Sequence, residues 1–538
     1  MVSDMKKRVA IIGAGPSGLP AIRHAVAYGV IPVCFESSDK IGGVWNYTDQ
    51  ESPDTSVMHT TVMNSSKEMS AYSDFPPEAD KPNFMHHTQL LQYFCDYASH
   101  FDLEKYVRLN HTVQNIYRSE SFKNDGKWVV EFKDDKGVPA REVFDGVLVA
   151  IGHHQFPNQS ARWSGQDQFK GKIIHAKSYK HCGGYDNKRV VVVGVGNSGI
   201  DIAVELSRIS QNIVLSSRRG CWIAGRTSDY GVPLDVATNS RFFNHALLPY
   251  VPSFLKNYLF ERKLNMKFDH EAYGLRPAHS VFGAHLTTND DIGARLFCGS
   301  ITIKPNIQSF TANDVVFEDG SRISNVDEVI LATGYNIKFP IIENGKLIKT
   351  DHNQLDLYKF MYPVGLEKNT LAVLGCIQPS GCVWPIAEMQ SRVFLAHLTG
   401  EAELPTVLGM ETDVHLKRID MMNTFYGSDR HTIQVSYVPY MDELAALLGC
   451  RPHFADFLLS DPCLAYETTF GPCSPYVYRL KGPHVWTGAR DAILKLKKRV
   501  RQGYNPGKNS YRKKDVVSID VYMLLIVLTI AILCYFLF

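Results

Sequence analysis

The sequence predicts an α/β protein with two parallel sheets, the second inserted into the domain of the first, and a C-terminal transmembrane helix. Two glycine-rich turns, at residues 13–18 and 194–199, each follow a short β-branched run and lead into a helical pattern. This order is typical of strand–turn–helix units in parallel sheets. Two further apolar runs, at 149–152 and 329–334, both end in glycine, and we interpret them as paired crossings between the two domains.

The first turn has the sequence Gly13-Ala14-Gly15-Pro16-Ser17-Gly18. It joins a predicted strand at 9–12 to a predicted helix at 19–28, and a second strand at 31–35 ends at Glu36. In this context the three glycines allow a tight turn, close approach of a pyrophosphate, and close helix–strand packing. The helix N-terminus offers unpaired N–H groups, and Glu36 is placed to bind an unphosphorylated ribose. The turn therefore predicts a dinucleotide site; the alternative is a glycine-rich turn that binds nothing.

The second turn, Gly194-Val195-Gly196-Asn197-Ser198-Gly199, repeats the pattern with a different charge at its end. The strands are predicted at 190–193 and 212–215, and the helix at 200–209. Where Glu36 stands in the first copy, the second has two serines followed by Arg218 and Arg219. Guanidinium groups suit a 2′-phosphate, which a carboxylate would repel. The second site is therefore predicted to bind NADP(H), unless the two arginines are only a solvated surface pair.

Composition excludes several classes of function. The 538 residues suggest two to four domains, and the net charge of +2 gives no electrostatic basis for nucleic-acid binding. The 11 cysteines show no C-x-x-C spacing. This predicts a reducing compartment, no disulfide framework and no metal site.

The C-terminal residues 521–538 are almost wholly apolar. Eighteen helical residues span about 27 Å, close to the thickness of a bilayer core. Many lysines and arginines precede them, between 495 and 514, and positive charge marks the cytoplasmic side of a membrane segment. We predict a tail anchor at 516–538 with the globular part in the cytosol; the alternative is a helix buried in the protein's own core.

The remaining segments predict the domain boundaries. A first domain would comprise residues 1–154 and 331–445, and a second domain would comprise 155–330, with a helical insertion at about 221–292. Residues 446–515 would form a C-terminal region and basic linker. Further helices are expected at 90–106 and 387–398, and strands at 128–132 and 143–151.

The combined motifs resemble one family, the flavin-containing monooxygenases of the animal, microsomal type. The resemblance covers essentially the whole chain, and the motif F-x-G-x-x-x-H-x-x-x-Y at Phe169–Tyr179 is highly specific for that family. The other matching segments are the two turns, Gly42–Trp45, Asn64–Met69, Ala332–Tyr335, Phe470–Tyr476 and the apolar tail.

By this resemblance the first site holds FAD and the second NADPH. Asn64 would hydrogen-bond both the flavin and the nicotinamide as the catalytic residue, whereas His175 and Tyr179 would be structural. The implied FAD-site residues are Gly13, Ala14, Gly15, Pro16, Ser17, Gly18, Glu36, Val44, Trp45, Met63, Asn64 and Ser65. The implied NADPH-site residues are Gly194, Gly196, Ser198, Gly199, Ile200, Asp201, Arg218 and Arg219.

The resemblance also implies an activity and a location. NADPH-reduced FAD would react with O2 to form a C4a-hydroperoxyflavin, which oxygenates sulfur or nitrogen in small xenobiotics or metabolites. The location would be the endoplasmic reticulum membrane, and the protein could form a homo-oligomer. The alternatives are Baeyer–Villiger oxygenation of ketones, an NADPH oxidase that releases H2O2, and a membrane-tethered binding protein. A disulfide reductase is a further alternative, but it needs a redox cysteine pair that the spacing does not provide.

Overall fold

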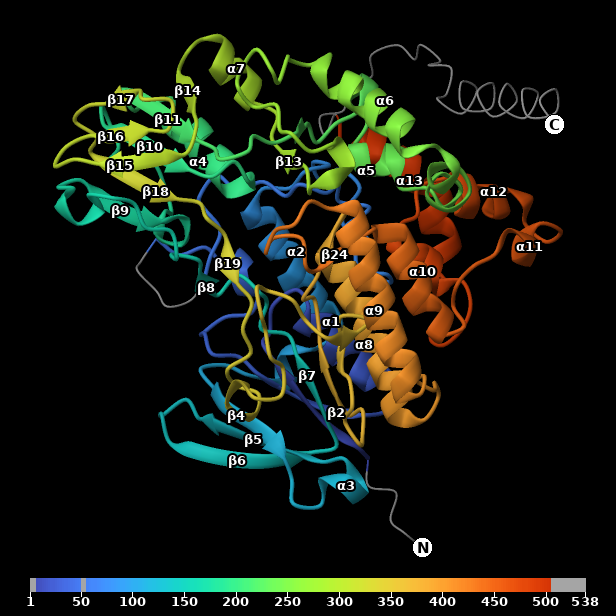
Figure 1. Cartoon of the computed structure of the whole chain (residues 1–538). Helices are drawn as coiled ribbons and strands as arrows, with labels where there is room; N and C mark the ends of the chain where they lie inside the picture. Colours follow the sequence, from blue (N-terminus) through green and yellow to red (C-terminus); the bar gives the residue numbers. More distant parts are fainter. Residues whose placement is uncertain (1–5, 50–54, 505–538) are drawn as a thin grey trace, which may run out of the picture.

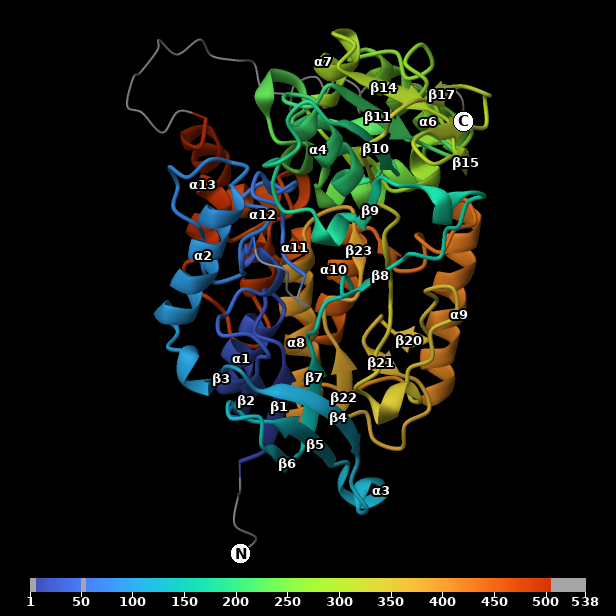
Figure 2. The ribbon, with the colours of Figure 1, turned by 90° about the vertical axis from the view of Figure 1, so that its left-hand side faces the viewer.

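Two parallel sheets form the framework of the protein. The computed structural model describes residues 6–49 and 55–504, and its two main sheets lie one above the other in both views (Figure 1, Figure 2). The first sheet has the spatial order β22-β7-β1-β2-β3, and all of its strand pairs are parallel. Its strands are β1 (Arg8–Ile12), β2 (Ile31–Phe35), β3 (Val107–Arg108), β7 (Gly146–Val149) and β22 (Leu371–Val373).

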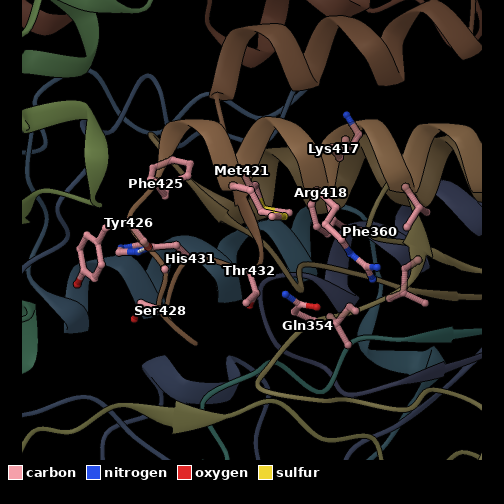
Figure 3. Close-up of a pocket in the computed structure, with 15 residues that line it drawn as sticks. Gln354, Phe360, Lys417, Arg418, Met421, Phe425, Tyr426, Ser428, His431 and Thr432 are labelled. Atoms are coloured by element: carbon pink, nitrogen blue, oxygen red, sulfur yellow. Dashed lines mark hydrogen bonds between the residues drawn. The ribbon is translucent and has the colours of Figure 1, made fainter. Parts of the chain in front are cut away.

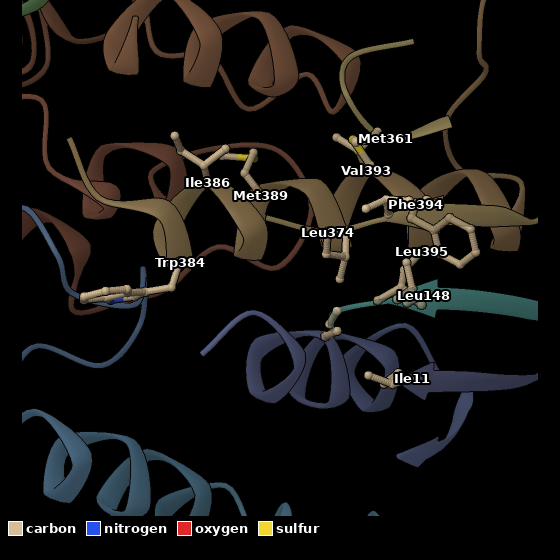
Figure 4. Packing of buried hydrophobic residues seen from close by; sticks show 14 of the residues in the cluster. Ile11, Leu148, Met361, Leu374, Trp384, Ile386, Met389, Val393, Phe394 and Leu395 are labelled. Carbon is tan, nitrogen blue, oxygen red and sulfur yellow. The ribbon is translucent and has the colours of Figure 1, made fainter. Parts of the chain in front are cut away.

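The core of the first sheet lies between its central strands and two helices, α1 (Gly18–Ala27) and α8 (Val383–Thr399). Strands β1 and β7 are buried along nearly their whole length, as expected for parallel strands covered on both faces. Figure 4 shows Phe394 and Leu395 of α8 packed over Leu148 of β7 and Ile11 of β1. Gly146 lets α8 approach, because a Cβ there would lie 3.1 Å from the Phe394 ring.

The second sheet also consists of parallel strands, in the order β14-β11-β10-β18-β9. Helix α4 (Asn197–Leu206) follows β10 and packs on β10 and β11. The strands are β9 (Lys172–His175), β10 (Arg189–Val193), β11 (Asn212–Ser216), β14 (Ile301–Lys304) and β18 (Glu328–Leu331).

The chain passes between the two sheets twice, and the two passages pair with each other. It leaves the first sheet after β7 and returns to it with β22, after all strands of the second sheet. The short strands β8 (Phe156–Pro157) and β19 (Tyr335–Asn336) form an antiparallel pair between the sheets. The backbone N–H of Asn158 donates to the carbonyl oxygen of Gly334 at 2.9 Å.

Smaller sheets and further helices surround this framework. Beside the first sheet lies an antiparallel meander, β4 (Thr112–Arg118), β5 (Trp128–Lys133) and β6 (Pro139–Phe144). Beside the second lies β15 (Ile307–Phe310), β16 (Val315–Phe317) and β17 (Arg322–Ile323). Two-stranded pairs are β12 (Ile223–Ala224) with β13 (Thr287–Thr288), β20 (Leu357–Tyr358) with β21 (Tyr362–Pro363), and β23 (Gln378–Pro379) with β24 (Gln434–Val435). The other α-helices are α2 (His87–His100), α3 (Phe122–Asp125), α5 (Leu234–Thr238), α6 (Ser253–Asn265), α7 (Ile292–Phe297), α9 (Val407–Thr424), α10 (Tyr437–Leu447), α11 (Phe454–Phe457), α12 (Pro462–Phe470) and α13 (Ala489–Gln502).

Three sequence-based expectations differ from the structure in detail. The helix expected at 90–106 spans His87–His100, and its continuation is broken at Asp102, which has a positive φ of 51°. The strand expected at 143–151 is divided between β6 and β7, because the chain turns at Asp145, whose carboxylate accepts the backbone N–H of Arg8 at 2.7 Å. The insertion at 221–292 contains one longer helix, α6, and is otherwise built of short elements.

The predicted membrane anchor at 516–538 lies outside the described residues. Within residues 6–49 and 55–504, none of the helices combines the length and apolar character needed to cross a bilayer.

Candidate active site

The first glycine-rich turn is closely packed against its own backbone. Gly13 has a φ of +104°, and a Cβ at this position would lie 2.7 Å from the carbonyl oxygen of Ala150. A Cβ on Gly18 would lie 1.9 Å from the carbonyl oxygen of Gly13. Neither position can hold a side chain without moving backbone, so the turn keeps α1 pointing its N-terminus at the carboxyl end of β1.

Glu36 closes the same turn from the end of β2. Its side chain accepts the backbone N–H of Ala14 at 2.8 Å and that of Ser38 at 2.9 Å. The residue is only 7% exposed. A buried carboxylate with these partners fixes the turn and places negative charge at the point where the sequence predicts a ribose.

The glycine pair Gly42-Gly43 covers the first turn. Gly42 donates its N–H to the carbonyl oxygen of Ala14 at 3.0 Å, and a Cβ on Gly15 would lie 3.5 Å from the Cα of Gly43. Val44 and Trp45 follow directly in a short 3-10 helix, and the Trp45 ring meets that of Trp384 edge to face at 5.9 Å. The structure thus brings the predicted FAD-site residues 13–18, 36, 44 and 45 together at one edge of the first sheet.

The second turn has the same backbone arrangement but a more open surface. Gly194 has a φ of +113°, and a Cβ on Gly199 would lie 2.0 Å from the carbonyl oxygen of Gly194. A Cβ on Gly196, by contrast, would meet nothing within 4 Å. Ser198 is exposed at the start of α4, whereas Ile200 is fully buried.

Residues 287–289 hold the beginning of α4. The Thr287 hydroxyl donates a hydrogen bond to the carbonyl oxygen of Val195 at 2.8 Å. The backbone N–H of Thr288 donates to Asn197 Oδ1, also at 2.8 Å. The side chain of Asn289 donates to Asp201 Oδ1, also at 2.8 Å. Burial raises the pKa of the Asp201 carboxyl to about 6. The insertion therefore supports the second turn through side chains that no sequence motif indicated.

Arg218 and Arg219 are both exposed after β11, and no ion pair of either is found among the described residues. The Arg219 guanidinium lies 5.1 Å from the centroid of the Tyr426 ring. Burial and the nearby charge of Arg218 lower the pKa of Arg430. Guanidinium groups without an acidic partner in the described part of the chain would suit a phosphate dianion.

A cavity of about 100 Å³ lies beneath α9 (Figure 3). Tyr426, which contacts Arg219, is one of its lining residues, and Lys417, Arg418 and Met421 line it from α9. Figure 3 shows His431 and Tyr426 at the same end of the cavity. One end of this cavity therefore lies beside Arg219, through Tyr426.

The loop that carries Asn64 is fixed by residues of the insertion. Arg226 Nε donates to the carbonyl oxygen of Met63 at 3.3 Å, and the Ser66 N–H donates to Asp235 Oδ2 at 2.7 Å. Burial raises the pKa of the Asp235 carboxyl to about 6. Asn64 itself is exposed, and Ser65 beside it is partly exposed. The loop is held at both ends while the Asn64 amide stays accessible.

A buried charge network anchors the loop from its other side. Lys67 Nζ and Glu68 Oε1 lie 2.8 Å apart with both side chains fully buried, and Arg499 Nε reaches the same carboxylate at 3.0 Å. The Tyr476 hydroxyl donates to Glu68 Oε2 at 3.0 Å. These contacts join the loop of Asn64 to the C-terminal helix α13.

The segment Phe169–Tyr179 forms the edge of the second sheet. His175 Nε2 lies 3.1 Å from the carbonyl oxygen of Gly334, and the Tyr179 hydroxyl donates to Glu205 at 3.1 Å. Both side chains are buried. These contacts agree with a structural role for His175 and Tyr179.

Two glycine-rich strand–turn–helix units, with a carboxylate after the first and two arginines after the second, are typical of an oxidoreductase that binds two different dinucleotides. A family model described as "Flavin-binding monooxygenase-like" matches residues 6–537. The chain belongs to this family of flavin-containing monooxygenases, and it is an enzyme that uses FAD and NADPH.

Relatives and solved structures agree with this assignment. The chain is 41% identical to flavin-containing monooxygenase 5 of Rattus norvegicus, over 99% of this chain and 100% of the relative. It is 40% identical to flavin-containing monooxygenase 2 of Homo sapiens, over 92% of each chain. The S-allyl-L-cysteine S-oxygenase of Allium sativum has the same fold, with a TM-score of 0.64 at 22% identity, over 91% of this chain and 99% of that one. The NADP+-bound cyclohexanone monooxygenase of Rhodococcus sp. Phi1 superposes with a TM-score of 0.58 at 16% identity, over 82% and 98%.

Proposed function

We propose that this monooxygenase transfers an oxygen atom from O2 to sulfur or nitrogen in small, soft nucleophiles. The observation that carries the proposal is the exposed amide of Asn64, in a loop held in place by Arg226 and Asp235. An amide can donate and accept hydrogen bonds but cannot transfer a proton. Such a residue suits a reaction in which the cofactor supplies the oxidant and the protein positions it.

The two turns divide the binding of the cofactors in this proposal. The FAD site would be formed by residues 13–18 with Glu36, Val44 and Trp45, and residues 1–154 and 331–445 would make up the FAD domain. NADPH would bind at 194–201 with its 2′-phosphate at Arg218 and Arg219, on a domain of residues 155–330. The open space at Gly196 and the absence of acidic partners for both arginines among the described residues support this division.

The protein's part in the reaction is to orient groups and exclude water. Bound FAD, reduced by NADPH, supplies the chemistry that activates dioxygen. The Asn64 amide would hold hydrogen-bonding atoms of both cofactors, with Met63 and Ser65 on either side. Arg226 and Asp235 would set the position of that loop, so that a small displacement of the insertion would alter the alignment of the reacting groups.

The substitution Asn64→Asp tests this role. A carboxylate at this position places a negative charge beside the reacting groups, and we expect NADPH consumption to continue while the oxygenated product falls at least about tenfold. The ratio of sulfoxide or N-oxide to NADPH consumed measures this coupling, and released H2O2 should account for the remainder. A fully coupled Asn64→Asp enzyme would refute the role of Asn64.

Asn124→Asp in α3 is the matched control, because it makes the same chemical change at an exposed position in a surface helix. It should leave the coupling unchanged. A series of thioethers, tertiary amines and ketones then separates the two kinds of oxygenation. If only ketones are oxygenated, with insertion beside the carbonyl, the activity is of the Baeyer–Villiger type.

We further propose that the enzyme is anchored in the endoplasmic reticulum membrane by residues 516–538, with its catalytic part in the cytosol. The apolar sequence of that segment and the basic residues before it support this location. Removing the segment should release the protein from membranes into the soluble fraction. Cross-linking of the full chain in membranes would then show whether it forms a homo-oligomer.

A further inference from the structure

A second cavity lies at the opposite end of α1 from the first glycine-rich turn. It has a volume of about 320 Å³. Its walls come from the second half of α1, the end of α2, the loop of Asp74, and residues 479–486 near the C-terminus. Arg23, Asp74, His100, Arg479, His484 and Trp486 are among the residues that line it. None of these belongs to either predicted cofactor site.

Two arginines in this cavity share one carboxylate oxygen. Arg479 Nη2 lies 2.7 Å from Asp74 Oδ2, and Arg23 Nη2 lies 3.5 Å from the same atom. The side chains of Arg479 and Asp74 are each only 3% exposed. One negative charge therefore faces two positive charges, and the Arg479–Asp74 pair is buried, where an unpaired charge is destabilising.

Neighbouring groups do not supply the missing negative charge. Glu388 bonds to His24 at 3.0 Å and to the N–H and hydroxyl of Ser73. Burial lowers the pKa of His24 well below its usual range, so this histidine is neutral. Among the described residues, the fully buried Arg392 close by donates to the carbonyl oxygens of Tyr478 and Pro483 and to the sulfur of Met389, and to no carboxylate.

Counting these groups leaves a net charge of +1. Arg23 and Arg479, which line the cavity, contribute two positive charges, and Asp74, which also lines it, contributes one negative charge. The further carboxylate of Glu401, which influences His484, is exposed to solvent. The cavity is therefore electropositive.

The hydrogen-bonding groups in the cavity indicate what would balance that charge. Arg479 has two buried donors, Nε and Nη1, that have no hydrogen-bond partner among the described residues. Oδ1 of Asp74 is likewise a buried acceptor without a partner in that part of the chain. The Arg23 guanidinium is held 4.4 Å above the Phe101 ring, which fixes its direction. A ligand that suits these groups must accept from guanidinium N–H groups and donate to a carboxylate.

We propose that this cavity binds a small oxyanion that carries an O–H group, of the hydrogenphosphate type. Its unprotonated oxygens accept hydrogen bonds from Arg479 and Arg23, and its O–H donates to Asp74 Oδ1. Planar guanidinium groups are well suited to phosphate oxygens. Because the ligand bridges α1 to residues 479–486, it also ties the C-terminal region to the first sheet. The site does not depend on the proposed catalytic function.

Isothermal titration of the FAD-loaded full chain with inorganic phosphate at constant ionic strength tests this site. Saturating NADP+ is present throughout, so that Arg218 and Arg219 are occupied. We expect saturable binding of phosphate at pH 7, and binding at least about tenfold weaker for sulfate, which has no O–H to donate to Asp74. A phosphate monoester in place of inorganic phosphate then shows whether the cavity accepts the free anion alone or a phosphorylated small molecule.

Four variants locate the binding in the cavity. Arg23→Gln and Arg479→Gln should each weaken phosphate binding by at least about tenfold. Ala27→Leu should block binding without changing any charge, since Ala27 lines the cavity. This variant tests the site even if Arg479→Gln does not fold. Arg490→Gln, which removes an exposed arginine paired with Asp461, should have no effect.

Three results would overturn the proposal. If titration with phosphate gives heat changes no larger than titration with chloride, the cavity holds water only. Unchanged phosphate affinity in Ala27→Leu and Arg23→Gln would place the binding elsewhere. Phosphate binding that is seen only in a parallel titration without NADP+, and not in its presence, would assign it to Arg218 and Arg219.

Discussion

The two glycine-rich turns have the same backbone conformation, but they differ in what packs over them and in the charge of the residues at their ends. At the first, Gly42-Gly43 lies across the turn and Glu36 closes its end. At the second, the space beside Gly196 is open, and the corresponding end carries Arg218 and Arg219. A covered turn suits a cofactor that stays bound, and an open turn suits one that must enter and leave. The same local motif thus gives two sites with different tasks.

The largest effect should appear when the most closely packed glycine of the first turn and the open glycine of the second turn are each replaced by alanine. In Gly18→Ala the new Cβ would lie 1.9 Å from a backbone oxygen, whereas in Gly196→Ala it would meet nothing within 4 Å. We expect Gly18→Ala to be purified without flavin or not to fold, and Gly196→Ala to keep its flavin and lose only affinity for NADPH. Flavin absorbance and NADP+ titration measure the two effects. Equal flavin loss in both variants would contradict the assignment of the flavin to the first turn.

A smaller effect is expected at the ribose end of the second turn. Replacing both Arg218 and Arg219 with alanine removes two charge-assisted hydrogen bonds to the 2′-phosphate. We expect the dissociation constant for NADPH to rise about 100-fold, with little change for NADH. Arg208→Ala, at an exposed arginine paired with Asp291, should change neither constant. Equal losses for NADPH and NADH would contradict the assignment of the phosphate.

The smallest effect concerns Asp235, which joins the insertion to the loop of Asn64. Aspartate titrates near pH 4 in an unfolded chain, whereas burial raises the pKa of Asp235 to about 6. The folded state thus favours the protonated carboxyl. Its contribution to stability is complete below about pH 4 and is lost as the pH rises through about 6.

Asp235→Asn cannot ionise, and Asn can still accept the Ser66 N–H. Above pH 6 this variant should therefore be more stable than the wild type, by about 1–2 kcal/mol, and the difference should vanish toward pH 4. Thermal unfolding at several pH values measures the difference. Asp229→Asn, at a 69% exposed aspartate of the same insertion, should show no such gain. A pH-independent difference for Asp235→Asn would mean that its carboxyl does not titrate in this range.

The sequence was sufficient to predict the parts of the site that depend on local spacing. The glycines, the strands that flank them and the charged residues after each second strand lie within short stretches of chain, and the structure has these elements where the motifs indicate. The supporting contacts were not predictable in this way. Arg226 reaches Met63 across 163 residues, and Asp235 reaches Ser66 across 169, so only the tertiary fold brings them together. The same holds for Arg430 and Tyr426, which lie beside Arg218 and Arg219 without any motif of their own.

The boundaries of elements were less predictable than their existence. The helix expected at 90–106 ends at His100 because the backbone changes direction at Phe101 and Asp102. The apolar pattern continues through Tyr106, which packs against the same core. Periodicity therefore indicated burial correctly there but extended the helix by six residues.

The central claim is that reduced flavin in the first site, with NADP+ held in the second, passes oxygen to a nucleophile. The most direct measurement mixes NADPH-reduced enzyme with oxygen, follows flavin absorbance with and without a thioether, and measures the sulfoxide and H2O2 formed. We expect slow return to oxidised flavin without the thioether, faster return with it, and one sulfoxide for each NADPH. Immediate return to oxidised flavin with one H2O2 per NADPH, whether or not the thioether is present, would contradict the claim.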